Sequence, residues 1–139
     1  MSRKIIPEVV HDQDLLQLPS SATVREAARR MRTRHVGAVL VVSGERLEGI
    51  FTERDVVNRV VAEGLDPDGT TLATVMTTNP DTIAPTDTAI TALRRMQDGG
   101  YRHLPVVDHG HLVGIVSRRD FDGDEKARLD TETKLWERV

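Results

Sequence analysis

Hydrophobic and polar positions follow the same order twice along this chain. In the first block, residues 15–18 form a short apolar stretch, and residues 23–34 carry apolar side chains at helical spacing. The continuous β-branched run 36–42 predicts a buried strand, and 47–51 predicts its hairpin partner. A valine-rich helix is expected over 52–62. The pattern predicts one β-α-β-β-α unit.

The second block repeats these elements with a different ending. A short strand is expected at 81–84, a helix from Ala89 that Gly99 and Gly100 end, and a hairpin with strands 104–107 and 112–116. After Asp120 the valines of the first block are absent. We therefore expect a short turn and then a C-terminal helix over about 124–137, whose apolar residues are Leu129, Leu135 and Trp136.

An internal repeat links the two blocks at an offset of 65 positions. Segment 49–55 recurs as 114–120, without a gap. The recurring positions upstream are Thr23, Ala27, Arg29, Arg30 and Met31, which return as Thr88, Ala92, Arg94, Arg95 and Met96. The Pro-, Gly- and Asp-containing stretch 65–71 reads as the linker, and 1–14 as a lead-in that wraps onto the second repeat.

Each copy ends a buried strand in a hydroxyl residue with an acid three positions later. These pairs are Thr52 with Asp55, and Ser117 with Asp120. Ser/Thr-x-x-Asp is a capping box, which closes a helix N-terminus. The same junction also suits an anionic ligand, since a hydroxyl can donate to a phosphate and a carboxylate can accept from ribose hydroxyls. The pattern leaves both interpretations open.

The doubled Gly-apolar-apolar-Thr/Ser-x-x-Asp pattern, with Leu-Pro-Val-Val at 104–107, resembles a tandem pair of CBS domains over roughly residues 8–122. The resemblance implies an α/β fold of two β-α-β-β-α repeats, 8–65 and 72–122, packed face to face with pseudo-twofold symmetry. The 123–139 tail lies outside it. It further implies a stand-alone, non-enzymatic module, a Bateman module, that senses AMP, ADP, ATP or NAD(H), needs no metal and forms a homodimer.

The resemblance places one nucleotide cleft at each repeated turn. Apolar side chains would hold the base, the hydroxyl and arginines the phosphate, and the Asp the ribose. The expected second cleft comprises Thr82, Ile83, Pro85, Tyr101, Arg102, His103, Leu104, Pro105, Val116, Ser117, Arg118, Arg119 and Asp120. The expected first cleft comprises Gln17, Leu18, Val36, Gly37, Ala38, Val39, Phe51, Thr52, Glu53, Arg54 and Asp55.

Local charge differs between the two turns. Arg118, Arg119 and Arg102 surround the second, whereas Arg54 is opposed by Glu53 at the first. Because charge-assisted hydrogen bonds to phosphate are stronger than neutral ones, we expect the second cleft to prefer the more phosphorylated ligand.

Composition narrows the class of protein. A net charge of −3 and a pI near 5.9 argue against a general nucleic-acid or anionic-membrane binder. The chain has no cysteine, so disulfides and thiolate metal sites are excluded, in keeping with a cytoplasmic location. The start of the chain lacks a signal-peptide pattern, and no apolar run approaches the length of a membrane span.

The remaining constellations favour ordinary structural roles. His109 and His111 flank a predicted turn and are read as solvated rather than metal-binding. The arginine pairs 29–30 and 94–95 are read as solvated helix faces. The apolar faces of helices 24–31 and 56–61 predict a homodimer. Two other functions stay open: a purely structural dimerisation module and a nucleic-acid-binding regulator.

Overall fold

Two compact units make up the chain. The computed structural model describes residues 2–137, with side chains up to Thr131. One unit is the continuous segment 14–80, and the other combines residues 1–13 with 81–139. Each unit contains one copy of the repeat, and each is described below by itself.

The 14–80 unit contains a four-stranded sheet in the order β1-β2-β3-β4. β1 runs parallel to β2, whereas β3 is antiparallel to both β2 and β4. The strands are β1 (Gln17–Leu18), β2 (Ala38–Ser43), β3 (Arg46–Thr52) and β4 (Thr77–Thr78), and the helices are α1 (Val24–Arg34), α2 (Glu53–Asp55) with its continuation η2 (Val56–Val61), and α3 (Leu72–Val75).

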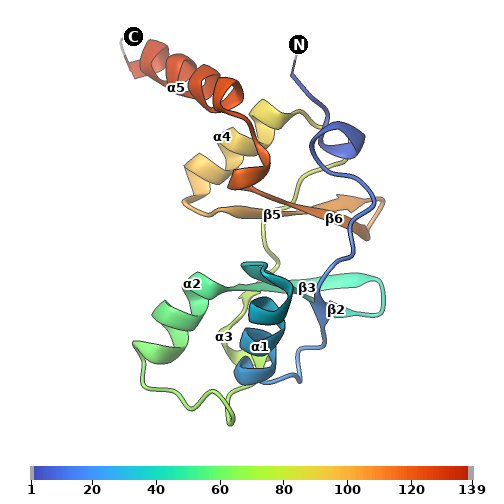
Figure 1. The fold of residues 1–139 in the computed structure, drawn as a ribbon, viewed down its shortest axis with the longest axis vertical. Coiled ribbons are helices and arrows are strands. Elements are labelled where there is room, and N and C mark those ends of the chain that lie inside the picture. Colours follow the sequence, from blue (N-terminus) through green and yellow to red (C-terminus); the bar gives the residue numbers. More distant parts are fainter. Residues whose placement is uncertain (1, 138–139) are drawn as a thin grey trace. The chain divides into compact units, whose positions relative to one another are not determined.

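Helix α1 forms where the sequence predicts it. Thr23 accepts a hydrogen bond from the Glu26 N–H at 3.2 Å and so caps the first turn, and His35 ends the helix in the left-handed conformation. The apolar face of α1 packs on the sheet, and α1 and α2 lie on the same side of it (Figure 1). The core of this unit includes Val24, Ala27, Met31, Val39, Phe51 and Val60.

Helix α3 and strand β4 were not predicted. The Leu72 N–H donates to the Ala22 carbonyl at 2.9 Å, and Val24 donates to the Thr70 carbonyl at 3.0 Å, which holds this segment against the start of α1. β4 then pairs two residues with the edge of β3. A four-residue helix and a two-residue strand are too short to leave a periodic pattern in the sequence. Residues 72–80 consequently pack with the first repeat.

The other unit is built on the hairpin of β5 (His103–Asp108) and β6 (His111–Ser117). Helices α4 (Ala89–Gly99) and α5 (Gly123–Glu137) lie on the same side of this hairpin (Figure 1). η3 (Arg118–Asp120) is a short turn directly after β6. The core residues include Ile83, Ala92, Leu93, Met96, Leu104 and Val116.

The strand expected at 81–84 is reduced to a single bridge between Ile83 and Val106. Ile83 exchanges hydrogen bonds with the main chain of β5, donating to the Pro105 carbonyl at 2.9 Å. The next amide, of Ala84, instead donates to the Asp87 carboxylate at 3.0 Å. Pro85 is the next residue whose amide would face β5, and it has no N–H, so the pairing ends after one bridge.

The lead-in wraps onto the second repeat, as predicted. It forms η1 (Ile5–Val9), a single wide helical turn, and the Ile5 side chain is fully buried in the core of this unit. The Ala89 N–H at the start of α4 donates to the Arg3 carbonyl at 2.7 Å. Further along, the Gln13 side chain accepts from the Ile115 N–H and donates to its carbonyl, both at 2.9 Å. Gln13 therefore covers the free edge of β6 as a strand would.

The C-terminal helix α5 matches its prediction within one residue. Asp122 and Glu125 form a reciprocal capping box, with hydrogen bonds of 2.8 and 3.1 Å to each other's amides. Leu129 is buried, and so is Phe121 just before the helix. Gly123 is the first residue of α5, after the short turn that the sequence predicted. The predicted apolar residues Leu135 and Trp136 lie outside the described side chains.

Candidate ligand-binding turns

The first turn joins β3 to α2 through Thr52 and Asp55. The Thr52 amide and hydroxyl both donate to Asp55 Oδ2, at 2.9 and 3.1 Å. The Asp55 amide donates back to Thr52 Oγ1 at 3.3 Å. The capping box expected from the sequence is therefore present at the first copy. The outer oxygen, Asp55 Oδ1, faces Arg59 Nε at 3.5 Å.

The second turn reproduces this geometry between β6 and η3. The Ser117 amide donates to Asp120 Oδ2 at 2.7 Å, and its hydroxyl does so at 3.2 Å. In both copies one carboxylate oxygen closes the turn, and Oδ1 is not used in the box. Capping and ribose recognition are therefore compatible roles for the same aspartate, because each needs a different oxygen.

The same main-chain hydrogen bond ties each turn to the entry of the neighbouring strand. The Glu53 N–H donates to the Gly37 carbonyl at 3.0 Å, and the Arg118 N–H donates to the Arg102 carbonyl at 2.9 Å. The hydroxyl–aspartate turn and the strand entry that were predicted to line the same cleft thus lie side by side within each repeat.

Most of the apolar residues predicted to hold a base are buried in the core of their own unit. Leu18, Val39 and Phe51 do so in the 14–80 unit, and Ile83, Leu104 and Val116 do so in the other. Their side chains are at most 8% exposed. The predicted apolar positions whose side chains remain half-buried are Val36, Pro85 and Tyr101.

Arg3 contacts the second turn and was missing from the predicted set. Arg3 Nη2 donates to the Asp120 carbonyl at 3.3 Å and to Glu125 Oε1 at 2.6 Å. The pKa of the Arg3 guanidinium is raised above its usual value, mainly by the hydrogen bond to Glu125 and further by the negative charge of that carboxylate. The sequence carried no signal for this contact, because it joins positions more than 100 residues apart.

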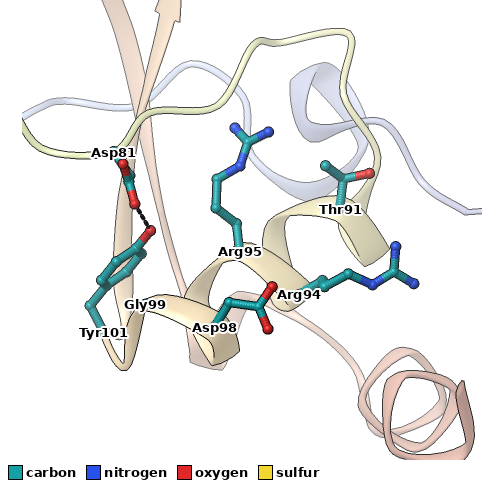
Figure 2. Close-up of a pocket in the computed structure, with 7 residues that line it drawn as sticks. All are labelled: Asp81, Thr91, Arg94, Arg95, Asp98, Gly99 and Tyr101. Atoms are coloured by element: carbon teal, nitrogen blue, oxygen red, sulfur yellow. Dashed lines mark hydrogen bonds between the residues drawn. The ribbon is translucent and has the colours of Figure 1, made fainter. Parts of the chain in front are cut away.

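A pocket of about 380 Å³ lies beside α4 in the same unit (Figure 2). Arg95 reaches across it and donates to the Thr82 carbonyl, and the Tyr101 hydroxyl donates to the Asp81 carboxylate. Arg95 is half-buried, so the prediction of a solvated face holds for Arg94 but was wrong for Arg95. The pocket is lined by Asp81, Thr91, Arg94, Arg95, Asp98, Gly99 and Tyr101.

Tyr101 is expected to ionise only at strongly alkaline pH. Burial, the hydrogen bond to Asp81 and that carboxylate's charge raise its pKa to about 12. In the folded protein the pKa of Tyr101 lies above the usual value of about 10, so the protonated phenol stabilises the folded state. This contribution to folding stability is complete below pH 10 and is lost as the pH rises towards 12. Tyr101 is the sole tyrosine, so phenolate absorbance at 295 nm measures it directly.

The Asp81→Asn variant measures how much the Asp81 carboxylate contributes to the raised pKa of Tyr101. Its Tyr101 pKa should fall towards 10 without reaching it, because burial remains. Asp108→Asn, at the exposed β5–β6 turn, is the matched control and should leave the titration unchanged. A tyrosine pKa near 10 in the native wild-type protein would contradict this prediction.

Within residues 2–137, no helix is both long and apolar enough to cross a membrane. The same described residues contain no group of three His, Asp or Glu side chains placed to hold a metal. His109, read from sequence as solvated, pairs with Asp108 at 2.8 Å on the exposed β5–β6 turn.

Two β-α-β-β-α repeats with matching hydroxyl–aspartate turns define an α/β tandem-repeat protein. The CBS domain family profile matches residues 6–62 and 72–122, so the chain belongs to the CBS domain family. The resemblance seen in the sequence is thereby confirmed.

Known proteins resemble the chain over most of its length. It is similar to the CBS domain-containing protein CBSCBSPB3 of Arabidopsis thaliana, with 44% identity over 102 residues. The match covers 73% of this chain but only 18% of the length of that relative. A CBS domain protein of Pyrobaculum aerophilum, solved in complex with AMP, superposes with a TM-score of 0.77 at 31% identity, covering 87% of this chain and 95% of that one. A candidate signal-transduction protein with CBS domains from Burkholderia ambifaria superposes with a TM-score of 0.73 at 31% identity. The match covers 76% of this chain and 78% of that one.

Proposed function

We propose that this chain is a regulatory sensor of adenosine nucleotides: AMP, ADP, ATP or NAD(H). The observation that carries the proposal is the pair of matching turns, in which a hydroxyl and an aspartate are locked together and one carboxylate oxygen is left outside the box. The AMP complex of the Pyrobaculum relative supports the choice of ligand. No metal is required in this proposal, and the absence of cysteine agrees with a cytoplasmic location.

In this proposal the hydroxyl residue and the aspartate of each turn contact different parts of the ligand. The hydroxyl of Thr52 or Ser117 and nearby N–H groups contact the phosphate, and Asp55 or Asp120 accepts from the ribose. Binding would signal by favouring one conformation of the module over another, which a protein partner then reads. The chain's role is therefore regulatory rather than catalytic.

Calorimetric titration with AMP, ADP, ATP and NADH at tens of micromolar tests the proposal. At least one of the four should give measurable heat and raise the melting temperature, because a ligand that binds only the folded state stabilises it. Absence of both heat and thermal shift for all four ligands would reject nucleotide sensing.

Self-association is the second candidate function, and it is favoured by exposed valines on η2. Val57 and Val61 are 60% and 66% exposed, although Val60 between them is fully buried. The sequence pattern had assigned all these valines to one apolar side. Exposed apolar side chains on one helix are typical of an interface, and we propose a second copy of this chain as the occupant. A structural module of this kind would dimerise without responding to nucleotides.

We expect the wild-type protein to be a dimer and the double variant Val57→Asp, Val61→Asp to be a monomer of 15.5 kDa. Two carboxylates buried in an apolar interface would remain without partners. Light scattering at high micromolar concentration measures both states. The matched control is Val113→Asp, an exposed valine on β6 that should leave the dimer intact. A stable wild-type monomer at that concentration would refute the interface.

A further inference from the structure

Two structurally equivalent positions differ sharply in charge between the repeats. The hydrogen bond from residue 53 to residue 37 and the one from residue 118 to residue 102 are the same bond at an offset of 65. In the first repeat the two positions hold Gly37 and Glu53, with a combined charge of −1. In the second they hold Arg102 and Arg118, with +2. The residue after Glu53 and the residue after Arg118 are both arginine, Arg54 and Arg119, so the next position along each turn carries the same charge.

The Glu53 side chain is seated against Gly37. A Cβ atom added at Gly37 would stand 2.7 Å from Glu53 Oε1 and 3.2 Å from its Cδ. The missing side chain of Gly37 therefore leaves the space that the carboxylate occupies. The φ angle of Gly37 is not in the left-handed region, so backbone freedom does not explain this glycine. Its small size lets an acid lie at the entry of β2, beside Thr52.

Resting on the nucleotide site proposed above, we infer that Gly37 and Glu53 form a charge filter. At the first turn, this filter favours a nucleoside that carries a neutral or positive group at the position where AMP carries its phosphate. At the second turn, Arg102 and Arg118 favour an anionic phosphate. A phosphate near the first turn would meet the Glu53 carboxylate, and like charges at such short range repel strongly even at a protein surface. The two repeats would then bind different members of one ligand class.

The ratio of AMP affinity to adenosine affinity, measured at each turn, tests this filter directly. Amide NMR signals of Thr52 to Asp55 report on the first turn, and those of Ser117 to Asp120 report on the second, within the full chain. In the wild-type protein, adenosine should bind the first turn more tightly than AMP does, and AMP should bind the second more tightly than adenosine does.

Glu53→Gln removes the charge and keeps the shape of the side chain. It should raise the AMP-to-adenosine affinity ratio at the first turn about tenfold, equivalent to about 1.4 kcal/mol, and leave the second turn unchanged. Glu63→Gln is the matched control. It removes the same charge from an exposed position in the turn after η2, ten residues further along the chain.

The outcomes separate the filter from the site itself. An unchanged ratio in Glu53→Gln, or equal ratios at both turns of the wild-type protein, would overturn the filter while leaving nucleotide binding intact. A ratio that rises equally in Glu63→Gln would show a general charge effect and would also overturn it. If neither AMP nor adenosine shifts the signals of either turn, the filter is overturned, and the titrations with ADP, ATP and NADH decide whether nucleotide binding fails with it.

Discussion

Asp120→Ala is expected to weaken nucleotide binding at the second turn tenfold to a hundredfold. Asp120 Oδ2 is committed to Ser117, but the ribose would lose the charge-assisted hydrogen bonds to the remaining oxygen, worth about 1.5–3 kcal/mol. The loss of the capping box should cost only about 1 kcal/mol of folding free energy. Calorimetric titration and chemical denaturation of the same variant measure the two effects separately.

Asp122→Ala is a close control for this variant. It also removes an acid from a capping box, at the start of α5, but it lies outside the hydroxyl–aspartate turn. It should lose similar folding stability and retain nucleotide affinity. If Asp120→Ala instead lowers the melting temperature and binds nucleotide as well as the wild-type protein does, then the second turn is a helix cap only.

Phe51→Ala is expected to lower the free energy of unfolding by about 3–5 kcal/mol. Phe51 is fully buried in the core of the 14–80 unit, and truncating a buried phenylalanine removes its contacts and leaves a cavity. Such a loss is a large fraction of the 5–15 kcal/mol that typically holds a protein folded. Urea denaturation followed by circular dichroism measures the change.

Val113→Ala provides the contrast, because Val113 is 40% exposed on β6. It should change stability by no more than about 0.5 kcal/mol, as is usual for surface substitutions. A loss below 1 kcal/mol in Phe51→Ala would mean that the core around β3 can close over the cavity.

The sequence predicted the parts of the fold that depend on periodic burial. Helix α1 is bounded by its threonine cap, and the two hairpins follow continuous apolar runs that can be read without a structure. The hydroxyl–aspartate pairs were also predictable, because a capping box is local and has fixed spacing. Its duplication at an offset of 65 then indicated the family.

Long-range contacts were beyond such local patterns. The bonds from Arg3 to Asp120 and from Gln13 to Ile115 join polar side chains to distant main chain, and no spacing rule signals them. The half-burial of Arg95 depends on the carbonyl of Thr82, which a helical wheel does not include. Similarly, a helical pattern marks Val57, Val60 and Val61 alike, and only the packing distinguishes the buried one.

The nested order of the two units sets the sequence of events during synthesis. Residues 14–80 are contiguous, so that unit can fold as soon as it leaves the ribosome. The other unit needs Ile5 against a core that includes Leu93 and Leu104, which are made roughly 90 to 100 residues later. Residues 1–13 therefore cannot pack until the later part of this unit has been made, so this unit should complete its folding after the 14–80 unit.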